Sequence, residues 1–345
     1  MRNIYNLTIE ELEDYFLSIG EKKFKATQTY SWLYEKRINS FDEMTDMKKT
    51  VIEKLKEDFS LEKIKLIKVE RDVEVNKYLF ELHDKHYIES VLMRHDYGTS
   101  ICVSSQIGCN MGCKFCESGR LKKVRDLEPY EIVEQILLVE EDIKERISHV
   151  VIMGIGEPFD NYINVTNFIK IINHPKGLSI GSRHITISTS GIVPKILEFA
   201  DFPYQVNLAI SLHAPNDKIR NEIMPVNKAY KIKDIIDALK IYYKKTNRRI
   251  TFEYIMLDGI NDKDENAEEL CKLLKGLNCY INLIPYNETN NLGYKRSKND
   301  RILKFYDIIK KNNVGVTIRR EFGSNISAAC GQLRSRKEQL WRHFI

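Results

Sequence analysis

From residue 95 onward, short apolar segments alternate with longer segments whose apolar residues recur at helical spacing. The apolar segments read SICVSS, HVVIMG, HITIST, VNLAISLH, ITFEYIML, YINLIP and VGVTIR, and helical patterns are clearest at residues 128–147, 230–245, 265–277 and 300–311. Strands that alternate with helices form parallel sheets. Such sheets bind ligands at the carboxyl ends of their strands. The sequence therefore predicts an α/β fold with a functional site at one end of a parallel sheet.

The first 94 residues follow a different pattern. Thr8 and Glu11 form a capping-box signature at the start of a predicted helix, which ends near Gly20. Two further helical patterns cover residues 24–37 and 46–59, and alternating runs at residues 63–72, 76–84 and 87–96 predict short antiparallel strands. We therefore expect an N-terminal helical accessory domain with strands (residues 1–94), an α/β core (residues 95–333) and a basic C-terminal tail (residues 334–345).

The net charge of +5 is unevenly distributed along the chain. Residues 1–90 hold 16 Lys/Arg and 19 Asp/Glu, whereas the remaining residues hold 38 and 30, a net of +8. Such an excess suits a polyanionic partner such as RNA. Candidate contacts, for which a solvated surface is the alternative, are Lys122, Lys123, Arg125, Lys295, Arg296, Lys298, Arg334, Arg336, Lys337 and Arg342. The segment of residues 22–37 mixes lysines with aromatic residues, which fits either a nucleic-acid contact or an amphipathic helix with a solvated face.

The chain shows no sign of export or membrane insertion. Its first residues, MRNIYNLTIEELEDY, lack the apolar core of a secretory signal, and its apolar runs are too short to span a bilayer. We therefore expect a cytoplasmic protein. In a reducing compartment, cysteines serve metal binding or catalysis more often than structural disulfides.

Three of the seven cysteines, Cys109, Cys113 and Cys116, lie close together in the stretch CNMGCKFC. A structural zinc site needs four ligands, commonly on two paired arms, and this stretch supplies one such arm. His213 and Cys330 could complete a zinc site in space. Alternatively, three thiolates can hold a 4Fe–4S cluster and leave one iron open to a small molecule. The spacing alone leaves both kinds of site open.

The surroundings of these cysteines resemble the radical S-adenosylmethionine (SAM) superfamily, whose CxxxCxxC motif follows the first strand of a β/α barrel. In that superfamily three cysteines hold a 4Fe–4S cluster, and SAM chelates the fourth iron. The resemblance assigns the cluster to Cys109, Cys113 and Cys116. It extends to GIGEP at residues 154–158, where Gly156 and Glu157 are expected near the amine of SAM. Further expected SAM contacts are Ser188, Ser211, His213 and Asn287.

Seven motifs narrow the resemblance to the RlmN/Cfr family of RNA methyltransferases. They read CVSSQIGC, CKFC, MGIGEP, STSGIVP, ISLHAPND, INLIPYN and AACGQL, and the similarity runs from the helical N-terminus to about Leu333. The family fold implies that residues 95–333 form a partial (β/α)6 radical-SAM barrel. Members methylate an adenine ring carbon, at C2 in the RlmN type and at C8 in the Cfr type, which confers antibiotic resistance.

We predict methylation at C2 of a 23S rRNA adenine in the peptidyl transferase centre, before ribosome assembly is complete, because the RlmN type is the widespread one. STSG and ISLHAPND lean towards RlmN, whereas LKKVRDL after the third cysteine leans towards Cfr, so C8 methylation stays the alternative. The resemblance leaves tRNA open as a second substrate. It also implies a monomer without membrane association and an electron donor such as flavodoxin or ferredoxin.

The family mechanism implies roles for three more residues. It uses two SAM molecules: the first methylates a cysteine that matches Cys330, and the second yields a radical that activates this methyl group for addition to adenine. A second cysteine, matching Cys102, then attacks the sulfur of Cys330 and forms a disulfide as methylated RNA leaves. The family's acid/base glutamate lies thirteen residues before this resolving cysteine, which points to Glu89. Cys271 and Cys279 are expected to be packing residues.

Two hypotheses of other classes remain at this point: a zinc-stabilised RNA-binding protein without catalysis, and an iron–sulfur redox carrier. The zinc protein predicts a metal site without sulfide, which metal and sulfide analysis separates from a cluster. The redox carrier predicts that SAM is not cleaved.

Overall fold

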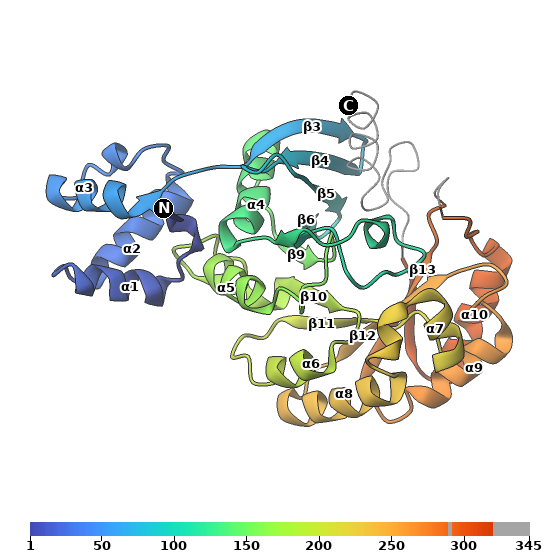
Figure 1. Cartoon of the computed structure of the whole chain (residues 1–345). Helices are drawn as coiled ribbons and strands as arrows, with labels where there is room; N and C mark the ends of the chain where they lie inside the picture. The colour runs from blue at the N-terminus through green and yellow to red at the C-terminus, as the bar shows by residue number, and fades with distance from the viewer. Residues whose placement is uncertain (289–291, 320–345) are drawn as a thin grey trace.

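A ten-stranded sheet forms the centre of the computed structural model (Figure 1), which describes residues 1–288 and 292–319. Within these ranges the strands are arranged in the order β14-β13-β12-β11-β10-β9-β6-β5-β4-β3. The parallel strands are β6 (Gly98–Cys102), β9 (His149–Ile152), β10 (Ile185–Thr189), β11 (Asn207–Ser211), β12 (Ile250–Met256), β13 (Cys279–Pro285) and β14 (Gly315–Ile318). The antiparallel strands are β3 (Lys65–Arg71), β4 (Val75–Glu81) and β5 (Tyr87–His95).

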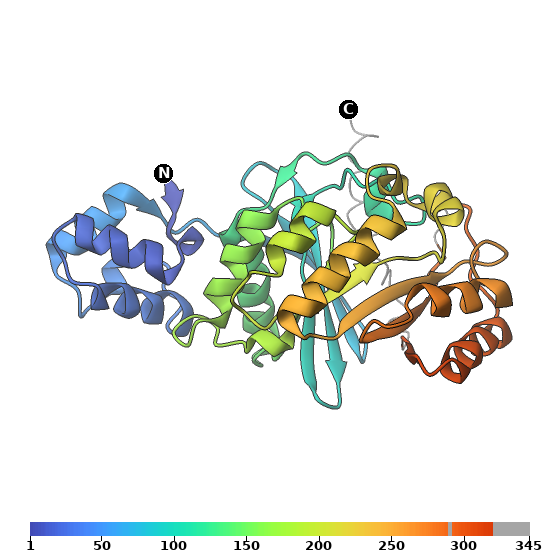
Figure 2. The ribbon, with the colours of Figure 1, turned by 90° about the horizontal axis from the view of Figure 1, so that it is seen from below.

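Helical crossovers join each parallel strand to the next, and several of them lie side by side over one face of the sheet (Figure 2). The helices are α4 (Pro129–Ile143), α5 (Tyr162–Asn173), α6 (Val193–Phe199), α7 (Asp217–Ile223), α8 (Ile232–Thr246), α9 (Asp264–Leu273) and α10 (Asn299–Lys311). Because β3 and β14 lie at opposite ends of the strand order, the sheet is an open, partial barrel, as predicted. Across the described ranges, no helix is both long enough and apolar enough to cross a membrane.

The parallel strands run from β14 at one edge of the sheet to β6, and they bury apolar side chains under the helices. Ile187 of β10 and Leu208 and Ile210 of β11 are buried and lie on the same face of the sheet. Ile235 and Leu239 of α8 complete this core from the outer layer. Burial of one such side chain contributes about 1.5–3 kcal/mol.

The predicted antiparallel strands are confirmed, and they extend the same sheet. β5 pairs with β6 through Val91 opposite Cys102 and Met93 opposite Ser100. Hydrogen bonds therefore join residues 65–95 to the barrel sheet, whereas the N-terminal helices lie apart from it, at the left of Figure 1. The division of the chain into domains near residue 95 stays a prediction.

The N-terminal helices form a small module, residues 2–60. It consists of α1 (Ile9–Ser18), α2 (Phe24–Tyr30), a π-helical turn (Ser31–Glu35) and α3 (Lys49–Asp58), and the short strands β1 (Arg2–Asn3) and β2 (Phe59–Ser60) pair in parallel. The predicted capping box at the start of α1 is present. The Thr8 N–H donates to the Glu11 carboxylate at 2.9 Å, and the Glu11 N–H donates to Thr8 Oγ1 at 3.4 Å.

Aromatic residues of the basic segment 22–37 belong to the core of this module. Tyr30, Trp32 and Tyr34 are buried, whereas Phe24 is about half exposed. Three of the four aromatic side chains are therefore unavailable for stacking on bases, which favours the amphipathic-helix interpretation of the segment. The module contacts the barrel through Asn6, whose side chain donates to the Glu128 carboxylate at 2.6 Å.

Candidate active site

A cavity of about 530 Å³ opens at the carboxyl ends of the parallel strands, where the sequence predicts the functional site. The structure brings together on its wall most of the predicted site residues: Cys102, Cys109, Cys113, Cys116, Gly156, Glu157, Ser188, Ser211, His213 and Asn287. Glu89 lies on β5, on the antiparallel side of the barrel. Cys330 lies outside the described residues, as do Arg334, Arg336, Lys337 and Arg342 of the predicted basic tail.

The three clustered cysteines lie on a loop between two short paired strands, β7 (Gln106–Ile107) and β8 (Arg125–Asp126). Backbone hydrogen bonds fold the loop onto itself: the Cys109 N–H donates to the Leu121 carbonyl at 2.9 Å. The Lys114 N–H donates to the carbonyl of Ile223 at 2.9 Å and ties the loop to α7. Gly108 is required here, because its φ is +80° and a Cβ would lie 2.2 Å from the Lys122 carbonyl oxygen. The loop is therefore shaped by backbone contacts before any ligand binds.

The thiols of this loop suit a metal cluster. Burial raises the pKa of Cys109 to about 12 and raises the pKa of Cys113 well above its usual value, so bound metal rather than the protein must stabilise the thiolates. Among the described residues no three His, Cys, Asp or Glu side chains converge on one point, as a zinc ion requires. A 4Fe–4S cluster instead spreads three thiolates over three irons, so these donors fit it.

The GIGEP loop after β9 forms the neighbouring wall. Gly156 has a φ of +116°, and a Cβ there would lie 2.7 Å from the Cβ of Gln106, so only glycine fits. The carboxylate of Glu157 accepts hydrogen bonds from the backbone N–H groups of Phe159 at 3.0 Å and Ser190 at 2.7 Å. Burial raises the pKa of Glu157, and these hydrogen bonds oppose the shift.

Gln106 joins the cysteine loop to the GIGEP loop. Its Oε1 accepts the Glu157 N–H at 2.8 Å, and its Nε2 donates to Asp126 at 2.8 Å and to Asp160 at 3.0 Å. Lys123 contacts the same two aspartates at 2.8 and 2.9 Å. Lys123, a candidate RNA contact, is thus held by protein carboxylates.

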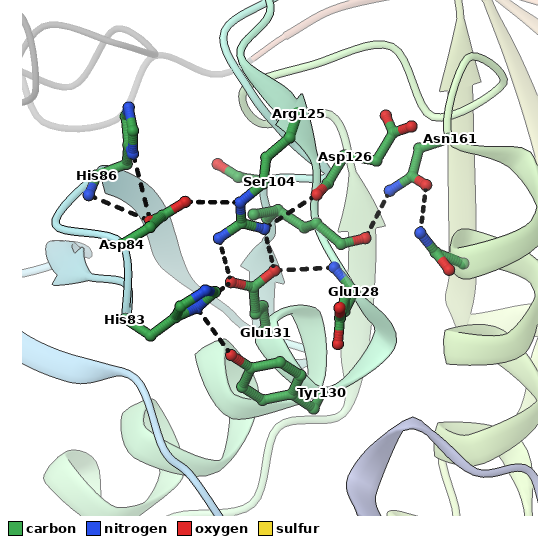
Figure 3. Close-up of polar contacts among 12 residues, drawn as sticks. His83, Asp84, His86, Ser104, Arg125, Asp126, Glu128, Tyr130, Glu131 and Asn161 are labelled. Atoms are coloured by element: carbon green, nitrogen blue, oxygen red, sulfur yellow. Dashed lines mark hydrogen bonds and ion pairs between the residues drawn. The ribbon is translucent and has the colours of Figure 1, made fainter. Parts of the chain in front are cut away.

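Arg125, a second candidate RNA contact, is also held within the protein (Figure 3). Its guanidinium binds Glu131 through two hydrogen bonds of 2.7 Å, and its Nε donates to Asp84 at 2.7 Å. Glu131 also accepts the Glu128 N–H at 2.9 Å, so the cluster joins β8 to α4 and to the turn between β4 and β5. Lys122, by contrast, is exposed.

The ends of β10 and β11 supply the polar floor of the cavity. The hydroxyls of Ser188 and Ser211 lie 3.3 Å apart. His213 adopts a left-handed φ of +59°, and its Nδ1 accepts the backbone N–H of Ile255 at 3.1 Å. Burial lowers the pKa of His213 to about 3, so its imidazole is neutral at physiological pH.

Two buried charged residues of this site were missed by sequence reasoning. Arg220 of α7 is fully buried and donates to the carbonyl oxygens of Ser190, Leu212 and Ser211, the latter two at 3.1 and 3.3 Å. It therefore holds the ends of β10 and β11 together, and no local pattern signals this role. Glu253 lines the cavity from β12, where burial raises its pKa. A carboxylate in the middle of the apolar run ITFEYIML is a signal that could have found it.

Cys102 lines the cavity from the antiparallel side of the sheet. It is the last residue of β6 and is 7% exposed. Glu89 lies on the neighbouring strand β5, two residues before the Val91 that pairs with Cys102. Glu89 is buried, and its Oε2 lies 3.0 Å from the ammonium nitrogen of Lys77 on β4. The three clustered cysteines and Cys102 thus line the same cavity.

Comparison with known proteins adds independent findings. The Radical SAM superfamily matches residues 103–271, and the ribosomal RNA large subunit methyltransferase N-terminal domain matches residues 2–61. A probable dual-specificity RNA methyltransferase RlmN of Enterococcus faecalis is 55% identical over 344 residues, covering 97% of this chain and 96% of that protein. The protein of the same name from Caldanaerobacter subterraneus is 51% identical over 336 residues, covering 97% and 98%. A crystal structure of a radical SAM methyltransferase from Sphaerobacter thermophilus superposes with a TM-score of 0.89 at 39% identity, covering 96% and 99%.

Proposed function

The chain belongs to the RlmN family of radical SAM RNA methyltransferases, and we propose that it methylates C2 of an adenine in 23S rRNA and of an adenine in tRNA. The observation that carries the proposal is one cavity lined by the three clustered cysteines, the GIGEP loop and Cys102. Relatives at 51–55% identity bear the RlmN name, which favours C2 methylation over the Cfr-type C8 alternative.

The cofactors of this superfamily are a 4Fe–4S cluster and SAM, which together supply the radical that activates a methyl group. We assign the cluster to the thiolates of Cys109, Cys113 and Cys116. Gly156 lets the loop pack tightly against Gln106, and we assign the amine of SAM to the backbone there. Glu157 holds the loop to Ser190 while offering negative charge. The remaining contacts to SAM are assigned to side chains that line the same cavity: Ser188, Ser211, His213 and Asn287.

Two thiols carry the methyl transfer in this proposal. Cys330, outside the described residues, is the methyl carrier, and Cys102 is the resolving thiol. The thiolate of Cys102 attacks the sulfur of Cys330, which forms a disulfide and breaks the bond between that sulfur and the methylene attached to the adenine. The leaving carbon takes the electron pair and a proton, which completes the methyl group. A cellular dithiol then reduces the disulfide for the next turnover.

Glu89 is the base in this proposal. It removes the proton from the adenine carbon that receives the methyl group: the C–H bond breaks, a carboxyl O–H bond forms, and the electron pair stays in the ring. A buried carboxylate accepts a proton more readily than one in water, because burial destabilises the charged form. The 3% exposure of Glu89 supports this role.

The remaining partners follow from the family. We propose that the enzyme acts in the cytoplasm as a monomer, on 23S rRNA before ribosome assembly is complete. A flavodoxin or ferredoxin supplies the electron. Within the described part of the chain, exposed basic residues such as Lys122, Lys295 and Lys298 remain candidate phosphate contacts.

Mass spectrometry of rRNA and tRNA tests the proposal. The gene is expressed in a host that lacks its own enzyme, and the modified adenines are compared with those of the host alone. We expect 2-methyladenosine in both RNAs. Finding 8-methyladenosine would assign the Cfr-type reaction, and finding no methylated adenine would contradict the proposed activity.

A further inference from the structure

We propose that Lys77 is a positioning residue that keeps the carboxylate of Glu89 ionised and oriented for proton removal from the substrate base. The inference rests on the proposed function, in which Glu89 is the base. It adds a buried, charged residue of β4 to the proposed catalytic residues.

The strand register places Lys77, Glu89 and Cys102 on one face of the sheet. Lys77 of β4 lies opposite Val91 of β5, and Val91 lies opposite Cys102 of β6. Residues directly opposite each other in an antiparallel ladder share a face, and so do residues two apart along a strand. Glu89, two residues before Val91, therefore faces the same side as the Cys102 thiol.

Burial makes the Lys77–Glu89 pair unusual among the ion pairs described. The side chain of Lys77 is 0% exposed and that of Glu89 is 3% exposed, with Nζ 3.0 Å from Oε2. A lysine is almost never fully buried unless it is paired, because desolvation of the ammonium is costly. By contrast, the lysine of the pair that Lys68 and Glu70 form within β3 is 54% exposed.

A buried carboxylate that acts as a base must be ionised, although burial disfavours its charge, and the ion pair with Lys77 offsets this effect. Burial alone favours the protonated, inactive carboxyl, whereas a nearby cation favours the carboxylate. Lys77 therefore keeps Glu89 able to accept the proton, and its ammonium also fixes one carboxylate oxygen in place. After the transfer, the ammonium faces a neutral carboxyl, which promotes return of the proton to solvent and the next cycle.

The described strands place several other titratable groups on this face: Lys65, Lys68 and Glu70 of β3, Glu81 of β4, Tyr87 and His95 of β5, Cys102 of β6 and His149 of β9. Glu81 is engaged by Lys85 at 3.0 Å and by the hydroxyl of Tyr87 at 3.0 Å. His95 lies at the far end of β5, where its Nε2 contacts the Ser100 hydroxyl at 2.9 Å. Lys68 is paired with Glu70 at 2.7 Å, whereas Lys77 places its ammonium nitrogen 3.0 Å from the Glu89 carboxylate.

The test compares Lys77→Met with Lys77→Arg in the reconstituted holoenzyme, using an RNA fragment that contains the target adenine. We expect Lys77→Met to lose methylation at least tenfold at pH 7 and to regain much of it near pH 9, where Glu89 ionises without its partner. Lys77→Arg should keep most of the activity and the wild-type pH profile. Lys240→Met, which removes an exposed, ion-paired lysine of α8, is the control and should change neither.

A second measurement separates this role from simple stabilisation. In Lys77→Met the pKa of Glu89 in the folded state would exceed its value in the unfolded chain, so thermal stability should fall as pH rises between the two values. The double variant Lys77→Met/Glu89→Gln should remove that extra pH dependence. If Lys77→Met does not fold, Lys77→Gln, which removes the charge and keeps a hydrogen-bond donor, is measured in its place.

The outcomes distinguish the role of Glu89 as the base from the role of Lys77 as its positioning residue. Wild-type turnover by Glu89→Gln would show that Glu89 is not the base, and both the assignment and the role of Lys77 would be wrong. An inactive Glu89→Gln together with an unshifted pH profile in Lys77→Met and Lys77→Gln would overturn the role of Lys77 alone. A shifted profile that Lys77→Arg corrects would support it.

Discussion

Glu157 and Glu89 are both buried carboxylates, yet the protein stabilises them in different ways. Glu157, on the parallel side, accepts backbone N–H groups from Phe159 and Ser190 at 3.0 and 2.7 Å. Glu89, on the antiparallel side, contacts the ammonium of Lys77 at 3.0 Å. One carboxylate is held by the main chain, and the other by a buried cation.

The difference follows from where each residue lies on its strand. Ser190 comes directly after the end of β10, so its N–H is not part of the ladder and can bind Glu157. Glu89 lies within β5, opposite Leu79 of β4, where ladder hydrogen bonds occupy the nearby backbone N–H groups. A carboxylate on the face of a central strand therefore needs a side-chain partner.

Glu134 of α4 is a third buried carboxylate, and it has neither backbone N–H donors nor a cation bound to it among the described residues. It is 1% exposed, and neither of its oxygens has a hydrogen-bond partner among the described residues. It lines a cavity of about 490 Å³ that the N-terminal module shares with α4. Burial raises the pKa of Glu134 to about 7. The comparison predicts that substitutions on the parallel side, on the antiparallel side and at Glu134 will change activity and stability by different amounts.

The largest effect is expected on the parallel side, from Cys113→Ala. Loss of one of three thiolates should abolish iron-dependent absorbance and all methyl transfer to RNA, because the cluster has no replacement ligand in the loop. Anaerobic reconstitution followed by iron and sulfide analysis measures it. Cys271→Ala, a buried cysteine of α9 outside the cavity, is the control and should keep its cluster. Full activity in Cys113→Ala would contradict the assignment.

Cys102→Ala tests the antiparallel side. Turnover should stop, but methyl loading and addition to RNA should continue, so protein linked to RNA through Cys330 should accumulate. Denaturing gels with and without ribonuclease would show a slow-migrating species that collapses on digestion. A Cys102→Ala protein that keeps its cluster and shows no RNA-linked species would argue against the resolving role.

Arg220→Met tests how the parallel strand ends are held. Removing the guanidinium leaves the carbonyls of Ser190, Leu212 and Ser211 without their donor, so the protein should lose about 3 kcal/mol or more of stability. The KM for SAM should rise at least tenfold, since Ser188 and Ser211 lie on the same strand ends. Chemical denaturation and steady-state kinetics measure both effects. A folded variant with an unchanged KM for SAM would show that Arg220 stabilises the protein but does not contribute to SAM binding.

Glu134→Gln should give the smallest effect, and in the opposite direction. The pKa of Glu134 is raised in the folded state, so ionising this carboxyl destabilises the folded protein. This destabilisation is absent below pH 4.5, grows as the pH rises, and is fully present above pH 7. The variant should therefore gain about 1–3 kcal/mol at pH 8 and little below pH 4.5. Denaturation at both pH values checks this. Glu53→Gln, an exposed glutamate of α3, is the control and should gain nothing at either pH.

Local sequence patterns determined the parts of this protein that depend on neighbours along the chain. The alternation of apolar strands and helical segments predicted a parallel α/β sheet, the family resemblance implied its partial-barrel form, and Thr8 with Glu11 predicted the first helix. The spacing of Cys109, Cys113 and Cys116 predicted one loop with three thiols. These features are readable because covalent connection already places the residues within a few positions of one another.

Only the tertiary structure decided which distant charges meet. Arg125 and Lys123 were plausible RNA contacts from their sign, yet Asp84 and Asp160, 41 and 37 residues away, engage them. Lys77 finds its partner across a strand pair, and Arg220 caps carbonyls of two other strand ends. The partner of a charged residue cannot be read from the sequence around that residue, because folding brings the two together from distant positions. The sequence therefore determined where the cofactor loop lies, and the fold decided which carboxylates stay charged and by what means.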